Sequence, residues 1–157
     1  MIGYNSAEMP VSARSIEVLI VEDNPGDVHL IREGLKPAGK RFAMNLRIAE
    51  DGERAINLLT SDYRPDIILL DLNLPKVDGA GVLEYVRTNR TDLASTPVVV
   101  FSSTPQPMGN VIKWSPNAYI VKPSSLSEYL KAVERFAILW LEPAAKATSA
   151  KAADERV

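Results

Sequence analysis

IILLDLNLPKVDG, at Ile67–Gly79, is the segment from which the architecture of this chain can be inferred. It opens with four apolar residues, and Asp66–Leu70 is predicted to form a strand that is buried on both faces. Asp71 comes directly after this strand, where packing alone would favour another apolar side chain. Farther on, the apolar residues between positions 82 and 86 recur at helical spacing. The segment therefore predicts a strand, a loop that begins with a carboxylate, and a helix.

Strand and helix patterns alternate over the rest of the chain. Apolar, β-branched runs predict five strands, at Ile16–Val21, Met44–Ala49, Asp66–Leu70, Pro97–Phe101 and Ala118–Val121. Asn24-Pro25 predicts a helix start after the first strand, because Asn caps helices and Pro is tolerated at the first helical position. The last helix is expected from about Ser125 to Leu141. This alternation predicts an α/β fold, a flavodoxin-like (βα)5 doubly wound parallel five-stranded sheet.

Length, charge and composition limit the classes of protein. The 157 residues are enough for one domain, and we expect a globular unit at 16–142, a flexible arm at 1–15, and a tail at 143–157 that is a helical extension or disordered. A net charge of −2 favours neither nucleic acid nor an anionic membrane as a partner. The absence of cysteine excludes disulfides and thiolate catalysis. No signal peptide or membrane-spanning pattern is visible, so a cytoplasmic location is expected.

Polar side chains follow the predicted strands at their carboxyl ends, the edge at which open parallel sheets bind ligands. They are Glu22, Asp23, Asp71, Ser102 and Lys122. Three carboxylates that lie close together repel one another and need a cation. Because oxygen ligands without His or Cys suit Mg²⁺ or Mn²⁺, the pattern predicts a site for such an ion.

The chemistry of such a cluster fits phosphoryl transfer. A carboxylate such as Asp71 can attack phosphorus and form an aspartyl phosphate. A metal ion and the ammonium of Lys122 would offset the charge of the transition state, and Ser102 could donate a hydrogen bond to a phosphoryl oxygen. Taken alone, Glu22-Asp23 has a simpler explanation as a solvated turn or a helix cap, and Asp71 as a turn former. Only their combination at successive strand ends favours a functional site.

Four motifs resemble those of the receiver domains of two-component response regulators. They are LIVEDN at Leu19–Asn24, IILLDLNLPKVDG at Ile67–Gly79, VVVFSS at Val98–Ser103 and YIVKP at Tyr119–Pro123. The resemblance covers 16–142 and implies a signalling protein rather than an enzyme. It implies that Asp71 takes a phosphoryl group from the phosphohistidine of a sensor histidine kinase, with Mg²⁺ as cofactor. It also implies that the domain assists its own phosphorylation and dephosphorylation.

The same resemblance implies roles for single residues at the metal site. Asp71 corresponds to the phosphoacceptor, Asp23 to the acidic residue that contacts Mg²⁺ directly, and Glu22 to its neighbour, which usually acts through water. The backbone carbonyl of Asn73 would complete the metal site. Gly79 corresponds to a glycine of the loop after the phosphorylation site.

Other matching residues are implied to form a switch. Ser102 corresponds to the hydroxyl that turns toward the phosphoryl group, and Tyr119 to the aromatic side chain that changes rotamer with it. Lys122 corresponds to the lysine that the family has at this place, and Pro123 follows it, in many members through a cis bond. A new charge on Asp71 would draw Ser102 inward and change a distant surface.

Three further stretches narrow the resemblance. VEDNPGD, LDLNLP and FAILWL are most similar to stand-alone regulators that are paired with bacterial phytochrome kinases. The resemblance therefore implies a phytochrome-type sensor kinase as the partner. The output would be a protein–protein contact, feedback on the kinase, or onward transfer of the phosphoryl group.

One departure from the family concerns the fourth helix. Ser102 and Lys122 are 20 positions apart, slightly fewer than the family usually has. The span contains several residues that disfavour helix, namely Pro105, Pro107, Gly109 and Pro116. The fourth helix is therefore expected to be short or displaced, which puts in doubt the face that family members commonly use to dimerise. The last helix, with Trp140 and its apolar stripe, is instead the expected contact of a homodimer.

Three other classes of protein fit the sequence less well. An aspartyl-phosphate phosphohydrolase would also use a strand-end Asp and Mg²⁺, but it carries a second Asp two residues later, where this chain has Asn73. A phosphate-independent interaction module would be expected to have lost part of the acidic set or the lysine. A nucleotide-binding flavodoxin-like protein is disfavoured because no Gly-rich phosphate loop follows the first strand.

Overall fold

A five-stranded sheet lies between two layers of helices in the computed structural model, which describes residues 15–89, 91–105 and 109–147. The strands are β1 Ile16–Val21, β2 Met44–Ala49, β3 Ile67–Leu70, β4 Val98–Ser102 and β5 Ala118–Val121. The helices are α2 Pro25–Gly39, α3 Gly52–Thr60, α4 Gly79–Thr88, α5 Gly109–Lys113, α6 Leu126–Phe136 and the π-helix η3 Ala137–Leu141. The predicted flavodoxin-like α/β fold is confirmed.

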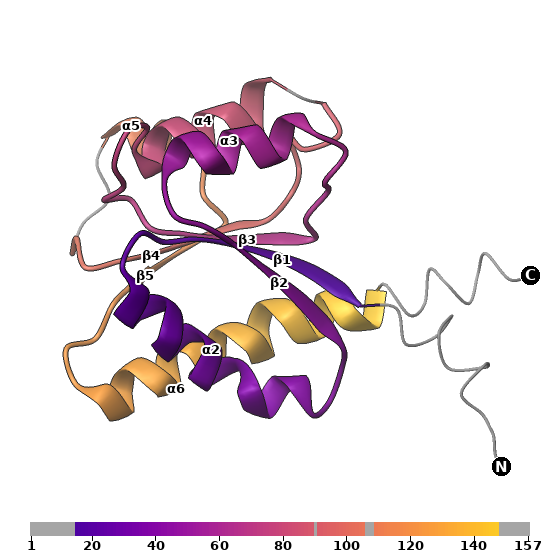
Figure 1. Cartoon of the computed structure of the whole chain (residues 1–157), viewed down its shortest axis with the longest axis vertical. Coiled ribbons are helices and arrows are strands. Elements are labelled where there is room, and N and C mark those ends of the chain that lie inside the picture. Colours follow the sequence, from indigo (N-terminus) through magenta and orange to yellow (C-terminus); the bar gives the residue numbers. More distant parts are fainter. Residues whose placement is uncertain (1–14, 90, 106–108, 148–157) are drawn as a thin grey trace, which may run out of the picture.

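The helices divide between the two faces of the sheet. In Figure 1, α3, α4 and α5 cover one face, and α2 and α6 cover the other. The expected flexible arm at 1–15 lies, except for Ser15, outside the described residues, as does the part of the expected tail at 148–157.

The strand order β2-β1-β3-β4-β5 brings the ends of two central strands together. All pairs are parallel, and the chain runs outward from β1 to β2 before it returns to β3 on the other side of β1. Val21, the last residue of β1, is paired with Leu70, the last residue of β3. Glu22 and Asp71 therefore leave neighbouring strands at the same level, at the switch point where sheets of this type bind ligands.

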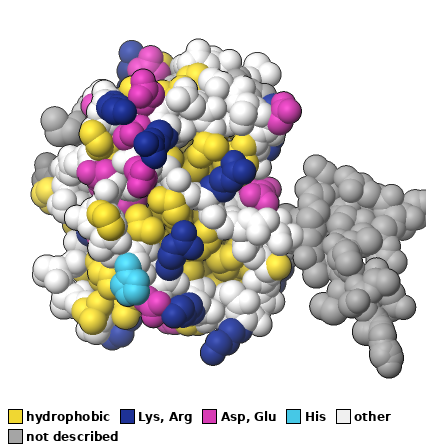
Figure 2. Space-filling view, in the orientation of Figure 1, with side chains coloured by type: hydrophobic (Ala, Val, Ile, Leu, Met, Phe, Trp, Pro, Cys, Tyr) yellow, Lys and Arg dark blue, Asp and Glu magenta, His cyan; other side chains and the backbone are white. Residues whose placement is uncertain are grey.

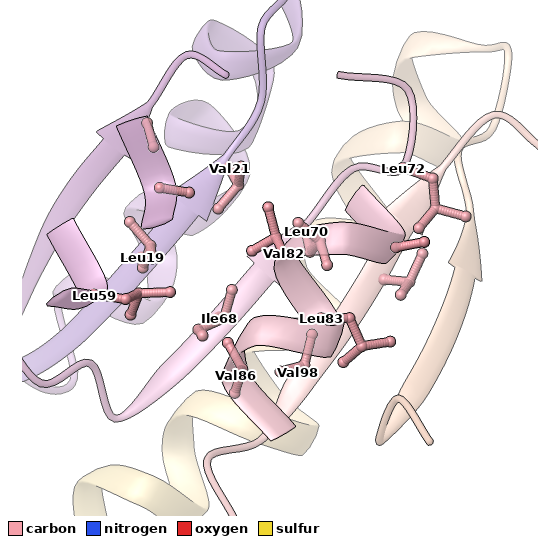
Figure 3. Close-up of a cluster of buried hydrophobic side chains, with 14 of the residues drawn as sticks. Leu19, Val21, Leu59, Ile68, Leu70, Leu72, Val82, Leu83, Val86 and Val98 are labelled. Carbon is pink, nitrogen blue, oxygen red and sulfur yellow. The ribbon is translucent and has the colours of Figure 1, made fainter. Parts of the chain in front are cut away.

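Each face of the sheet has its own apolar core. Along β1, Leu19 and Val21 belong to the core under α3 and α4, whereas Val18 and Ile20 belong to the core under α2 and α6. Figure 3 shows the first core, in which the β1 and β3 side chains meet those of α4, labelled Val82, Leu83 and Val86. Burying one such side chain contributes about 1.5–3 kcal/mol. The strand ends that carry the polar residues are thus held on a tightly packed support.

The local signals in the sequence set most element boundaries. The side chain of Asn24 accepts hydrogen bonds from the backbone of Gly26 (2.8 Å) and Asp27 (3.1 Å), which confirms the predicted start of α2. β3 and β4 each begin one residue later than predicted, as is common at element ends. For β4 the reason is that Pro97 has no backbone N–H to donate to the sheet.

The helices in the last third of the chain differ in length. In the described part of the chain α5 has five residues, which agrees with the predicted shortening of the fourth helix. The side chain of Ser125 caps α6 by accepting a hydrogen bond from the backbone N–H of Glu128. After η3, residues 142–147 are also helical, so the first part of the expected tail extends the last helix.

The apolar stripe of the last helix packs mainly on the chain's own sheet. Tyr129, Val133 and Phe136 are buried, and Trp140 is half-buried against the same core. Most of this stripe is therefore covered by the chain's own core, and the expected dimer contact through the last helix stays a prediction. The apolar side chains that remain exposed on η3 are Ile138 (48 %) and Leu139 (59 %).

Within the described ranges, no helix has the length and apolar character needed to cross a bilayer.

Gly79 is the position where the loop after Asp71 folds back onto the end of β3. Its backbone N–H donates to the carbonyl of Leu72, and a Cβ at Gly79 would lie 2.3 Å from the carbonyl oxygen of Asp71. We expect Gly79→Ala to lower the free energy of unfolding by about 3 kcal/mol, because the backbone must shift to make room. Urea denaturation followed by circular dichroism measures this loss.

Gly39→Ala is the matched control, because a Cβ there would meet no atom within 4 Å. Its free energy of unfolding should stay within about 1 kcal/mol of the unsubstituted protein. Equal denaturation midpoints for the two variants would contradict the proposed role of Gly79.

Candidate metal centre

Three carboxylates converge at the carboxyl edge of the sheet. Glu22 and Asp23 follow β1, Asp71 follows β3, and one oxygen from each lies within 4.8 Å of the others. Glu22 and Asp71 are buried, whereas Asp23 is exposed. The structure thus brings together the three acidic residues that the sequence placed at strand ends.

The backbone fixes these carboxylates to the sheet. The N–H of Asp71 donates to the carbonyl of Val21 at 3.0 Å, which continues the pairing of β1 with β3 by one residue. The carboxylate of Glu22 accepts a hydrogen bond from the N–H of Asn24 at 3.1 Å. The acidic side chains are therefore held by the same backbone that forms the sheet and the start of α2.

Lys122 brings a positive charge to this cluster from the end of β5. Its Nζ lies 2.7 Å from Glu22 Oε1, 3.3 Å from Asp71 Oδ2 and 3.3 Å from Asp27 Oδ2. The lysine side chain is only 10 % exposed. Its backbone N–H donates to the carbonyl of Ser102 at 2.8 Å, which ties it to the end of β4.

The charges in the cluster shift one another's pKa values. Burial raises the pKa of Glu22 to about 7, and the charge of Asp71 adds to this, although the hydrogen bond from Lys122 acts in the opposite direction. Burial by itself would lower the pKa of Lys122, but the hydrogen bond and charge of Glu22, together with the charges of Asp71 and Asp27, outweigh it. The net result is a raised pKa for Lys122, which stays charged at neutral pH.

The two predicted switch residues lie beside the cluster on β4 and β5. Ser102 is fully buried, and its hydroxyl oxygen accepts a hydrogen bond from the N–H of Thr104 at 3.3 Å. The hydroxyl of Tyr119 donates to the carbonyl of Thr104 at 2.8 Å. Both side chains therefore contact the same short segment after β4.

Asn73 and Pro123 complete the set of predicted residues. The N–H of Asn73 donates to Asp71 Oδ1 at 3.4 Å, and its side-chain amide donates to Thr104 Oγ1 at the same distance. Asn73 therefore lies on the exposed side of the cluster. The described residues contain no cis peptide bond, so Pro123 follows Lys122 through a trans bond. The cis bond implied by the resemblance is not present.

Asp27 is a residue of the site that the sequence analysis missed. It lies in the first turn of α2, where an acidic residue is common because it interacts well with the helix dipole. That local explanation gave no reason to connect it with Lys122, which is 95 positions away. A contact of this kind depends on the packing of α2 against the sheet edge.

The residues present fit a divalent cation of the Mg²⁺ type. The candidate ligands are oxygen atoms only, as hard cations prefer. The described carboxylates Glu22, Asp23, Asp27 and Asp71 outnumber the ammonium of Lys122, so the cluster retains negative charge that a cation would neutralise.

Comparison with known proteins agrees with this geometry. Residues 18–134 match the family described as the response regulator receiver domain, and the chain belongs to this family, whose function is to accept a phosphoryl group. The chain is 35 % identical to response regulator Rcp1 of Synechocystis sp. over 133 residues. This matched region covers 80 % of the chain and 88 % of Rcp1.

Two solved structures have the same fold. One is the phosphorylated cyanobacterial phytochrome response regulator RcpA, with a TM-score of 0.74 and 33 % identity over 81 % of this chain and 94 % of that one. The other is the Mn²⁺-bound form of Rcp1, with a TM-score of 0.73 and 34 % identity over 81 % of this chain and 95 % of that one.

Lys122→Met tests whether the lysine holds the carboxylates together. We expect it to lower the free energy of unfolding by about 3 kcal/mol at pH 8 in metal-free buffer, because the buried carboxylates lose their cation. The loss should shrink as the pH falls toward about 7, because Lys122 lowers the pKa of Glu22, and without it Glu22 takes up a proton at a higher pH than in the unsubstituted protein, where the pKa is about 7. Between these two pKa values the folded variant binds more protons than the folded unsubstituted protein, so its stability rises relative to that protein as the pH falls.

Lys131→Met is the control, because Lys131 makes an exposed ion pair with Glu128. This variant should change the free energy of unfolding by less than about 0.5 kcal/mol, with no added pH dependence. Chemical denaturation at several pH values measures both variants, and a loss in Lys122→Met that is independent of pH would contradict the expectation.

Proposed function

We propose that this chain is a single-domain response regulator in which Asp71 accepts a phosphoryl group from the phosphohistidine of a sensor histidine kinase. The observation that carries the proposal is the position of Asp71 beside two further carboxylates and 3.3 Å from the ammonium of Lys122. Membership of the receiver family supports the proposal, and so does the likeness to Rcp1, since the matched region covers 88 % of that protein.

In the proposed reaction, a carboxylate oxygen of Asp71 attacks the phosphorus atom while the phosphorus–nitrogen bond to the kinase histidine breaks. Glu22, Asp23, Asp71 and the backbone carbonyl of Asn73 would hold Mg²⁺, which when bound offsets the negative charge of the carboxylates and the phosphoryl oxygens. The Mn²⁺-bound structure of Rcp1 supports a divalent ion here. Lys122 would bind a phosphoryl oxygen of the product.

The proposed switch uses the contacts that surround Thr104. A phosphoryl group on Asp71 would attract the hydroxyl of Ser102, which at present accepts a hydrogen bond from Thr104. Tyr119 contacts the carbonyl of the same residue and would follow its movement. A change at the buried site would thus reach the surface between β4 and α5.

The alternative enzymatic functions have less support. A phosphohydrolase would need a second carboxylate at Asn73, whose side chain here donates to Thr104. A phosphate-independent module would have no need of the converging charges of Glu22, Asp71 and Lys122. We therefore infer a signalling protein that assists its own phosphorylation and dephosphorylation rather than an enzyme with a separate substrate.

The proposed partner is a sensor kinase of the phytochrome type, in the cytoplasm. The likeness to Rcp1 and to the phytochrome response regulator RcpA supports this choice. On the face shown in Figure 2, Lys and Arg side chains are interspersed with Asp and Glu, and no broad basic patch is visible. With a net charge of −2, this surface offers little to nucleic acid or to an anionic membrane.

Phosphorylation by acetyl phosphate and Mg²⁺, read by intact mass, tests the proposed acceptor. The unsubstituted protein should gain one phosphoryl group, whereas Asp71→Asn should gain none and EDTA should abolish the reaction, because the nucleophile or the metal is lost. A phosphorylated kinase of phytochrome type should serve as a faster donor than a kinase with another kind of sensor.

Asp62→Asn is the matched control, since Asp62 is an exposed carboxylate in the turn between α3 and β3, at the other edge of the sheet. It should react like the unsubstituted protein. Modification of Asp71→Asn to the same extent would mean that another residue is the acceptor.

We propose that two copies of the chain associate through the C-terminal helix. Ile138 and Leu139 are exposed there, and the helix continues beyond them to residue 147. Exposed apolar side chains on an extended helix favour contact with a second apolar surface. The buried apolar side chains of the last helix, including Phe136, pack on the chain's own core and would not take part in the dimer contact.

Light scattering at micromolar concentration, with and without a phosphoryl mimic, tests the dimer. The mass of the unsubstituted protein should be that of two chains, and Leu139→Glu should give a single chain, because a charge in an apolar interface is costly. Ile112→Glu, a change of an equally exposed apolar residue on α5, should leave the dimer intact. A monomeric mass for the unsubstituted protein in both conditions would remove the proposal.

A further inference from the structure

Asp27 and Tyr129 form a pair beside the lysine of the site. The hydroxyl of Tyr129, on α6, donates to Asp27 Oδ1 at 2.5 Å, and Asp27 Oδ2 lies 3.3 Å from Lys122 Nζ. The ring of Tyr129 is buried, and the side chain of Asp27 is 22 % exposed. The carboxylate of Asp27 therefore links Tyr129 on α6, through one oxygen, to Lys122 at the end of β5, through the other.

The ammonium of Lys122 has three protons and three carboxylate partners. Glu22 and Asp71 come from the sheet, and Asp27 comes from α2. With all three in place, the ammonium donates hydrogen bonds to Glu22 and Asp71 and forms an ion pair with Asp27, so carboxylates restrain it from three directions. Without Asp27, the shorter contact to Glu22 at 2.7 Å would dominate the position of the lysine.

Aromatic packing fixes the pair in place. The ring of Tyr129 meets Phe101 edge to face, with 5.2 Å between the ring centres, and the ammonium of Lys122 lies 5.8 Å from the centre of the Phe101 ring. Burial first, and then the hydrogen bond to Asp27, raise the pKa of Tyr129 above its ordinary value. Its hydroxyl therefore stays protonated and remains a donor to Asp27.

Close helix packing sets the distance between the two residues. α2 and α6 touch at Gly34, where a Cβ would lie 2.7 Å from the side chain of Val133. Asp27 and Tyr129 lie on these same two helices, on the side of the site. Their hydrogen bond is thus a consequence of helix packing rather than of two free surface side chains.

We propose that Asp27 and Tyr129 are a positioning pair that holds the ammonium of Lys122 ready for the phosphoryl oxygen on Asp71. The inference rests on the proposed function of Asp71 and adds two residues to it. Tyr129 acts through Asp27, and Asp27 acts through the lysine. Because positioning a charge before the reaction lowers the barrier, loss of either member slows phosphorylation without weakening the binding of the donor.

Tyr129→Phe, Asp27→Asn and the double variant test the pair, with acetyl phosphate as the donor and Mg²⁺ in excess. Each single change should lower the maximal rate of phosphorylation about tenfold and leave the apparent KM for acetyl phosphate and the Mg²⁺ affinity within roughly twofold. The double variant should be no slower than Asp27→Asn, because residues that act as one unit do not have additive effects.

Tyr63→Phe is the matched control. The Tyr63 hydroxyl is buried without a hydrogen-bond partner among the described residues, and it precedes β3, at the sheet edge opposite the site. Its removal should not change the rate. Tyr129→Phe keeps the packed ring, so it remains informative even where Asp27→Asn folds poorly.

Two outcomes would contradict the proposed positioning role of Asp27 and Tyr129. One is an unchanged rate in Tyr129→Phe, even with a lower melting temperature, since that is the mark of a purely structural contact. Another is a double variant whose loss is the product of the two single losses. Failure of the proposed phosphoacceptor role of Asp71 would look different from failure of the pair. In that case the unsubstituted protein would take up no phosphoryl group, or Asp71→Asn would take up as much as the unsubstituted protein.

Discussion

The charge of one lysine, placed among buried carboxylates, is the interaction on which the rest of the site depends. The Lys122 ammonium is 2.7 Å from Glu22 and 3.3 Å from both Asp27 and Asp71. Burial raises the pKa of Glu22 to about 7, and repulsion from the charge of Asp71 adds to this. The lysine keeps the acidic groups close while leaving enough negative charge for a divalent cation.

The geometry of the backbone makes this concentration of charge feasible. Val21 and Leu70 are paired at the ends of β1 and β3, so the residues that follow them emerge side by side. The loop after Asp71 then packs so closely that Gly52 and Gly79 have no room for a side chain, with a Cβ of Gly52 placed 1.8 Å from the carbonyl oxygen of Val77. In the proposed switch, a rigid support of this kind would let a small change at Asp71 move Thr104 and Tyr119.

Sequence patterns predicted much of the fold and of the site. The strands Ile16–Val21, Met44–Ala49 and Ala118–Val121 were predicted with their observed bounds, because apolar β-branched runs end at clear turn signals. The acidic cluster could be anticipated because the ends of parallel strands share one edge. Asp27 and Tyr129 could not, since each has an ordinary local explanation, as a first-turn acid and as a member of an apolar helical stripe.

By itself the sequence determined the order of strands and helices and the kinds of ligand atom at the strand ends. These depend on periodicity and capping among residues that are close along the chain. Only the tertiary structure decided that Asp27 reaches Lys122, that Trp140 is half-buried while Leu139 is exposed, and that Lys122 and Pro123 are joined by a trans bond. The side-chain placements depend on how α2, α6 and η3 pack on the sheet, which is set by contacts between residues far apart in the sequence.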